Sequence, residues 1–152
     1  MDKKKHTIDD LFKVDELWYL KSNKELFTGY SFGEYKGYHI NGKRDGNWII
    51  YYNSQDFADY AEGHVMMQGN YLNGKEHGVW FGYHDNGKLM YRWTYENGQR
   101  HGTSIWCEED GRLSSVGDYY DDKLQGYNLS YKVDGSIWEE ETGFYENGKK
   151  IK

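Results

Sequence analysis

Hydrophobic and polar residues alternate along most of the chain in short runs, and glycine-containing turns separate these runs. Asn-Gly and Asp-Gly pairs between alternating runs are the strongest short-range signal of a β-hairpin, because both residues accept a positive φ. One turn recurs as NGKRDG, NGKEHG, NGQRHG, a decayed DDKLQG and a final NGKK, at 41–46, 73–78, 97–102, 121–126 and 147–150. The pattern predicts tandem β-hairpins.

A second turn alternates with the first and sets the period of the repeat. Its glycines are Gly63, Gly87, Gly111 and Gly135. The glycines that close the first turn, Gly78, Gly102 and Gly126, lie 24 residues apart, whereas Gly46 precedes Gly78 by 32 residues. We therefore read each 24-residue unit as two short strands and two turns, with an 8-residue insertion near 55–62 in one unit.

Alternation within the strands sorts the side chains onto two faces of a predicted sheet. The third and fifth residues after each closing glycine are apolar in every unit: Ile49, Tyr51, Phe81, Tyr83, Ile105, Cys107, Leu129 and Tyr131. The second and fourth residues include Trp48, Trp80 and Trp106 but turn polar toward the C-terminus. We expect the first set to form the core and the tryptophans to lie on the other side.

A single hairpin cannot bury its own apolar face, so the units are expected to stack into one elongated, twisted antiparallel sheet of about ten strands. Residues 1–16 are expected to form an N-terminal segment or cap, and residues 17–152 the repeat domain. Thr7 and Asp10 have the spacing of a capping box, which favours a short helix over 7–13. Residues 17–37 predict one more hairpin that turns at Ser22–Asn23.

Glycine two residues before a recurring aromatic predicts that a ring lies flat on the sheet there. This glycine is Gly37, Gly69, Gly117 or Gly143, and Trp93 replaces it in one unit. The chain has 19 glycines and no proline, and 18% of its residues are aromatic. This composition suits a pleated sheet whose turns are made by glycine.

Charge adds a second asymmetry, since the chain carries −6 overall and residues 105–141 alone carry −7. Such a region disfavours nucleic acid and anionic membranes and attracts a basic partner. The other interpretation is a solvated face that keeps an aromatic-rich sheet soluble. One cysteine, no apolar leader and no long apolar run lead us to expect a soluble cytoplasmic protein without a signal peptide or membrane span.

The run over 69–102 resembles the MORN repeat in its bacterial second variant (MORN_2), and residues 17–29 are similar to the opening of those proteins. The resemblance covers about 17–150 and departs at the insertion, at the turn DDKLQG, and where tryptophan is missing after Gly102 and Gly126. It implies a hairpin-repeat fold whose motif residues are structural. It also implies similarity to the YwqK-type antitoxin or immunity family, some members of which neutralise toxins encoded beside them, while other MORN proteins are scaffolds or membrane-associated modules.

The residues suited to catalysis or metal binding fit structural roles. Cys107 stands where other units have tyrosine, and His77 and His101 share a turn position without metal-ligand spacing. The acid pairs Glu108–Glu109 and Glu139–Glu141 fall on strands whose neighbouring side chains point to opposite faces, or in solvated loops. We therefore expect no catalytic, cofactor-binding or metal-binding residues.

The hypothesis that best fits these observations is a protein-binding module, most simply an immunity protein that occludes a basic toxin; the alternative is a MORN scaffold or a membrane-proximal interaction protein. Exposed aromatics mark contact surfaces, although these tryptophans could instead pack on one another. Lysines at the last turn, Lys149, Lys150 and Lys152, favour a monomer in isolation. The candidate contact residues are Trp48, Trp80, Trp106, Asp56, Phe57, Asp59, Tyr60, Glu108, Asp110 and Asp118.

Overall fold

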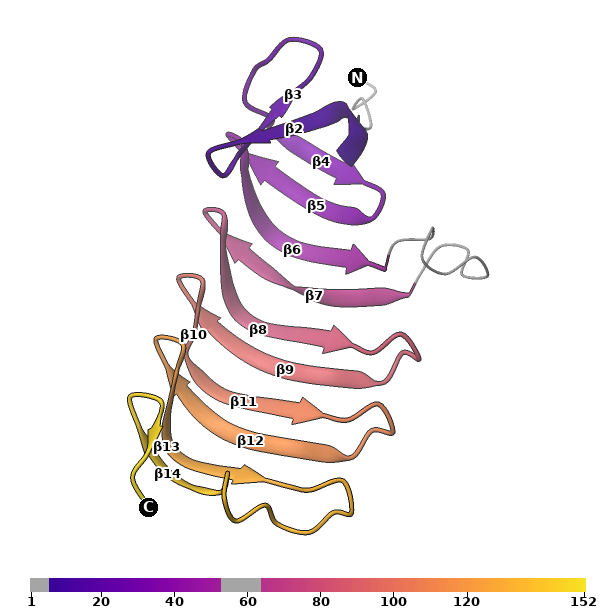
Figure 1. The fold of residues 1–152 in the computed structure, drawn as a ribbon. Helices are drawn as coiled ribbons and strands as arrows, with labels where there is room; N and C mark the ends of the chain where they lie inside the picture. Colours follow the sequence, from indigo (N-terminus) through magenta and orange to yellow (C-terminus); the bar gives the residue numbers. More distant parts are fainter. Residues whose placement is uncertain (1–5, 53–63) are drawn as a thin grey trace. The chain divides into compact units, whose positions relative to one another are not determined.

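A computed structural model describes residues 6–52 and 64–152 of the chain. Among these residues, thirteen strands belong to one open sheet and two strands form a separate small sheet. The chain divides into two compact units, an N-terminal unit, Met1–Glu76, and a C-terminal unit, His77–Lys152. The prediction of an all-β fold built from tandem hairpins is confirmed (Figure 1).

The sheet of the N-terminal unit follows the order β1-β4-β5-β6-β7. β1 pairs with β4 in parallel, so the sheet is mixed and the prediction of a purely antiparallel sheet is wrong at this strand. The other pairs of this unit are antiparallel hairpin neighbours. Its strands are β1 (His6–Thr7), β2 (Leu11–Val14), β3 (Leu17–Leu20), β4 (Gly29–Phe32), β5 (Tyr35–Ile40), β6 (Lys43–Tyr51) and β7 (Val65–Leu72).

The first described residues differ from the sequence prediction. The capping box of Thr7 and Asp10 is present, but it begins only one turn of 3-10 helix, Ile8–Asp10, rather than a helix over 7–13. The next four residues form β2, which pairs with β3. The turn between these strands is at Asp15 and Glu16, which both have positive φ. Short apolar runs rich in aromatic residues on both sides of that turn make the hairpin more favourable than a longer helix.

Residues 17–37 do not form the single hairpin that we expected. β3 pairs with β2 along one edge, and β4 pairs with β5 as a separate hairpin. The predicted turn near Ser22–Asn23 is present, because the Leu20 N–H donates to the carbonyl of Glu25 and the Phe27 N–H donates to the carbonyl of Trp18, both over 2.9 Å, around an isolated bridge from Tyr19 to Leu26. The chain therefore makes a short irregular hairpin at this turn and a second hairpin from β4 and β5.

The sheet of the C-terminal unit follows the order β8-β9-β11-β12-β13-β14-β15, with β10 paired to β9. The pairings described within it are antiparallel, and Figure 1 shows the hairpins following one another in chain order. The strands are β8 (Lys75–Tyr83), β9 (Leu89–Glu96), β10 (Gln99–Arg100), β11 (Gly102–Cys107), β12 (Leu113–Tyr120), β13 (Lys123–Ser130), β14 (Gly143–Glu146) and β15 (Lys149–Lys150).

The first kind of turn has the backbone geometry that its sequence predicts. Both central residues have positive φ in all five turns, and even the decayed copy keeps 47° at Asp121 and 64° at Asp122. Two positive φ values are the mark of a type I′ turn, whose twist matches that of the strands. The five pairs are Asn41–Gly42, Asn73–Gly74, Asn97–Gly98, Asp121–Asp122 and Asn147–Gly148.

The core lies on the face that carries the tryptophans, so our prediction that the other face forms the core is wrong. We call this side of each unit's sheet the tryptophan face, and the other side the opposite face. Trp48 is 0% and Trp80 is 2% exposed, whereas the third and fifth residues after the closing glycines are half-buried, apart from the buried Cys107. The remaining buried second and fourth residues are Ile50, Gly82, Ser104, Asn128 and Ser130.

Glycine explains why the tryptophan face packs so closely. Gly37 lies directly across from Trp48, and a Cβ on Gly37 would come within 2.3 Å of the indole ring. The ring therefore lies flat on the glycine backbone, as the sequence predicts for this pair. Gly82 gives the ring of Tyr91 the same room, since its Cβ would lie 2.1 Å from that ring.

Residues before β4 cover part of the tryptophan face in the N-terminal unit. Trp18 and Phe27 place their rings 5.9 and 5.1 Å from that of His39, which is fully buried. The main chain joins the same contact, because the Trp18 N–H donates to the carbonyl of Gly42 and the Gly42 N–H donates to the carbonyl of Phe27, both over 2.8 Å. This segment closes one end of the aromatic core.

Candidate binding surface

The structure separates the ten candidate contact residues into different environments. Trp48 and Trp80 are buried in the core, so neither offers a surface to a partner. The burial of Trp48 follows from Gly37, on which its ring lies. The candidates of the insertion, Asp56, Phe57, Asp59 and Tyr60, lie outside the described residues.

Trp106 is half-buried and belongs to a stack of aromatic rings on the tryptophan face of the C-terminal unit. The ring centroid of Tyr91 lies 4.0 Å from that of Trp93 and 5.9 Å from that of Trp106, with the planes within 19° of parallel. Ser104 stands at the repeat position of Trp48, and Trp93 stands where other units have glycine. The large and small residues have exchanged places, and the rings pack on one another, which was the alternative interpretation of the tryptophans.

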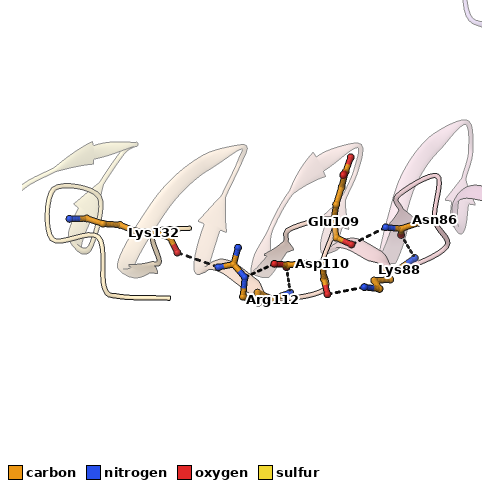
Figure 2. A network of polar contacts seen from close by, with 6 residues as sticks. All are labelled: Asn86, Lys88, Glu109, Asp110, Arg112 and Lys132. Atoms are coloured by element: carbon orange, nitrogen blue, oxygen red, sulfur yellow. Dashed lines mark hydrogen bonds and ion pairs between the residues drawn. The ribbon is translucent and has the colours of Figure 1, made fainter. Parts of the chain in front are cut away.

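Asp110 lies in a network that links the second kind of turn from one repeat to the next, and Figure 2 shows its members. Its Oδ1 accepts from the Arg112 N–H at 2.9 Å, and its Oδ2 lies 2.6 Å from the Arg112 Nε. The hydrogen bond from the Arg112 backbone is the main cause that lowers the pKa of the Asp110 carboxyl. Asp110 is exposed, but its carboxylate already forms an ion pair with Arg112.

The same turn geometry repeats along this edge of the C-terminal unit. Asn86 Oδ1 accepts from the Lys88 N–H at 2.9 Å, as Asp134 Oδ1 accepts from the Ser136 N–H, and bonding to Ser136 lowers the pKa of the Asp134 carboxyl. Lys88 Nζ then donates to the carbonyl of Asp110 at 3.0 Å (Figure 2). These bonds satisfy turn groups, so the network has a structural role.

Glu108 and Asp118 complete the set of candidates. Glu108 is half-buried and closes its turn, because its N–H donates to the carbonyl of Arg112 at 2.9 Å. Asp118 is exposed on the opposite face, and its Oδ1 accepts from the Thr103 hydroxyl at 2.7 Å. Asp118 is therefore the acid from this set that presents a carboxylate on a strand rather than in a turn.

The opposite face of the C-terminal unit carries an exposed apolar stripe that the sequence reasoning missed. We define the apolar stripe as Tyr127, Phe144 and Ile151, which are 51%, 49% and 58% exposed. Tyr127 lies directly across from Phe144, with ring centroids 5.1 Å apart in an edge-to-face arrangement. Ile151 lies across from Phe144 and donates its N–H to the Phe144 carbonyl at 2.8 Å. The three side chains thus follow one another across neighbouring strands.

The apolar stripe belongs to a unit with a net negative charge, and both acids and lysines lie near it. Asp118 lies across from Gln125, after a register shift that follows the pair of Val116 and Leu129. Tyr127 comes two residues after Gln125, so Asp118 and Tyr127 share the opposite face. Residues 77–152 have thirteen acids and nine bases, a net charge of −4. Eight of the fourteen exposed large apolar residues of the described chain also lie between Leu113 and Ile151. Exposed apolar surface and negative charge therefore occur in the same region.

Cys107 and His101, two residues with side chains suited to catalysis or metal binding, lie in different environments. Cys107 is buried, and burial, followed by the nearby charge of Glu108, raises the pKa of its thiol. The Nδ1 of His101 lies 3.7 Å from both Glu96 Oε2 and Asp121 Oδ1, and its ring packs on that of Tyr120. In the described part of the chain, no group of three His, Cys, Asp or Glu side chains is arranged to hold a metal ion.

The comparisons with known proteins add no relative. No protein-family model matches the chain, and no curated protein matches it. The similarity to MORN repeats stays a prediction that depends on the turn motifs quoted above. Within residues 6–52 and 64–152, no helix is long and apolar enough to cross a membrane.

Proposed function

We propose that this chain is a protein-binding module whose C-terminal unit holds a basic protein partner against its opposite face. The observation that carries the proposal is that the apolar stripe lies in a unit whose net charge is −4. Half-exposed aromatics on a rigid sheet supply contact area at low entropic cost, and they dominate binding energy when a partner covers them. Acids around them speed the approach of a basic surface.

We further propose that binding neutralises the partner, as in an immunity protein that occludes a toxin. The resemblance to bacterial MORN-variant antitoxins motivates this step, and the fold supports it by offering a regular scaffold. An occluding protein needs no reacting groups of its own, only a surface complementary to the site that it blocks.

The test is direct binding between the purified chain and the product of the gene adjacent to its own, measured by calorimetry and by survival of cells that express that product. We expect a 1:1 complex whose Kd rises as sodium chloride is raised, because salt screens the acids. No binding, together with no protection of the cells, would refute the proposal.

A pair of charge-reversal variants locates the surface. Asp118→Lys combined with Glu146→Lys reverses two exposed acids of the C-terminal unit, and we expect slower association and lost protection. Asp9→Lys combined with Glu25→Lys makes the same change at exposed sites of the N-terminal unit and should leave binding unchanged. Equal effects of the two variants would place the surface elsewhere. Binding to many unrelated proteins would favour the scaffold alternative.

A further inference from the structure

Two arginines of the chain show how this sheet holds a guanidinium group. The Cζ of Arg100 lies 4.2 Å from the ring centroid of Tyr119 and 5.2 Å from that of Trp93. The Nε of Arg100 lies 3.2 Å from Asp122 Oδ1. Arg44 likewise lies 4.8 Å from the ring of Trp48. At Arg100, two rings from different strands and an aspartate therefore stack and neutralise one arginine.

The opposite face offers the same three groups without a cation. The edge-to-face contact of Tyr127 and Phe144 leaves each ring about half exposed. Asp118, on the neighbouring strand, uses Oδ1 for the Thr103 hydroxyl, which fixes the carboxylate and leaves Oδ2 for another donor. Among the described residues, no arginine or lysine lies over either ring.

Of the lysines at the last turn, Lys149 shares this face and lies directly across from Glu146, whose carboxylate has the opposite charge. Lys150 lies across from Tyr145 on the other face, where its Nζ donates to the carbonyls of Glu139 and Glu140 at 2.7 and 3.0 Å. The net charge of −4 over residues 77–152 makes an incoming cation favourable. A flat guanidinium fits this site better than an ammonium, because it stacks on a ring while donating to a carboxylate in its own plane.

We propose that Tyr127, Phe144 and Asp118 form a subsite that takes an arginine side chain from a protein partner. The proposal rests on the proposed function and adds the chemistry by which the partner is recognised. The guanidinium stacks on the exposed face of Tyr127, contacts Phe144 beside it, and donates to Asp118 Oδ2. Ile151, beside Phe144, covers the aliphatic part of the arginine side chain.

Nuclear magnetic resonance titrations of the full chain test the subsite. The probes are the capped peptide Gly-Arg-Gly and its counterparts with lysine or citrulline, which has the shape of arginine without its charge. We expect saturable shifts centred on Tyr127, Phe144 and Asp118 with the arginine peptide, and affinity about tenfold lower with the citrulline peptide. Shifts spread evenly over the acids of the chain, or equal affinity for citrulline, would overturn the proposal.

Matched variants separate the subsite from general effects. Tyr127→Thr with Phe144→Thr keeps strand propensity and should abolish the localised shifts, as Asp118→Asn should weaken them. Tyr38→Thr removes a comparably exposed aromatic, 43% exposed, from the N-terminal unit, and Glu109→Gln removes another exposed acid; both should bind the peptide normally. Thermal denaturation of each variant checks that it is folded.

Failure of the subsite and failure of the proposed function give different results. If the adjacent gene product binds the Tyr127→Thr/Phe144→Thr variant with an unchanged Kd, the subsite is refuted and the binding function stands. If the arginine peptide binds as expected and the gene product does not bind, the subsite stands and the proposed neutralising function is refuted.

Discussion

His39 should make the folded chain sensitive to acid in a defined pH window. The side chain is 0% exposed and is surrounded by rings, with Trp48 edge-on at 4.9 Å, Phe27 at 5.1 Å and Trp18 at 5.9 Å. Neither ring nitrogen has a hydrogen-bond partner among the described residues. Burial, and to a lesser degree the charge of Arg44, lowers the pKa of His39 from 6.5 to about 4.

The sign of the effect follows from proton binding. Between about pH 4 and pH 6.5 the unfolded chain binds a proton at this histidine that the folded chain does not bind. The free energy of unfolding therefore falls as the pH decreases through this window, and the loss from His39 is complete near pH 4. A pKa difference of this size corresponds to roughly 3 kcal/mol, which is a large part of the stability of a small protein.

Urea denaturation at several pH values between neutral and acid conditions measures the effect, with His39→Leu as the reference. Leucine has a similar volume and no charge, and it removes two buried nitrogen atoms without partners, so it should be neutral or stabilising at pH 7. Below pH 6.5 the wild type should lose stability relative to the variant. Parallel stability curves for the two proteins would show that the histidine is solvated or paired and would refute the reasoning.

Three further predictions test the packing of the tryptophan face and the state of the thiol. Gly37→Ala should lower the free energy of unfolding by about 1–3 kcal/mol in urea denaturation, because its Cβ would overlap the Trp48 ring; an unchanged stability would contradict the flat-ring packing. Trp48→Ala should cost about 3–5 kcal/mol, and clearly more than Trp106→Ala, whose ring is half-buried; equal losses would contradict the assignment of the core. Cys107 should react with iodoacetamide much more slowly in the folded chain than in urea, since it is buried and the pKa of its thiol is raised; equal rates by mass spectrometry would place the thiol at the surface.

The turns could be predicted from sequence because their chemistry is local. Asparagine and glycine accept two positive φ values at low cost, and the structure places them in the same conformation at each copy. Even Asp121 and Asp122 keep the geometry, where hydrogen bonds to Arg100 support the turn. A local rule of this kind needs no knowledge of the tertiary structure.

The buried face could not be assigned by the same reasoning. A period of two divides the side chains into two sets but does not say which set is inside. The deciding feature is a relation between strands, since Gly37 lies across from Trp48 and makes room for its ring. The row of glycines was visible in the sequence, and weighing it above average hydrophobicity would have pointed to the tryptophan face.

The apolar stripe was missed for a different reason. Tyr127 lies on the same face as Leu129 and Tyr131, which the sequence reasoning had already placed together, but it comes one residue after the closing glycine and was not counted. Phe144 and Ile151 belong to the last, incomplete unit, where no closing glycine sets the register. Asp118 is among the candidates from sequence, but only the strand pairing shows that it lies near Tyr127 on the opposite face.

The tryptophan face forms the core and the opposite face is exposed, and this difference explains how a regular repeat can present a specific surface. The tryptophan face is constrained, because the rings of Trp48 and Tyr91 lie where a Cβ on Gly37 or Gly82 would overlap them. The opposite face has no such requirement, and Asp118, Tyr127 and Phe144 are exposed while the turns and the other face hold the strands. Substitutions at exposed sites away from caps and turns change stability little. The Tyr127→Thr/Phe144→Thr variant should therefore unfold within about 1 kcal/mol of the wild type. A much larger loss would mean that the apolar stripe stabilises the sheet itself, and its exposure would no longer argue for a partner.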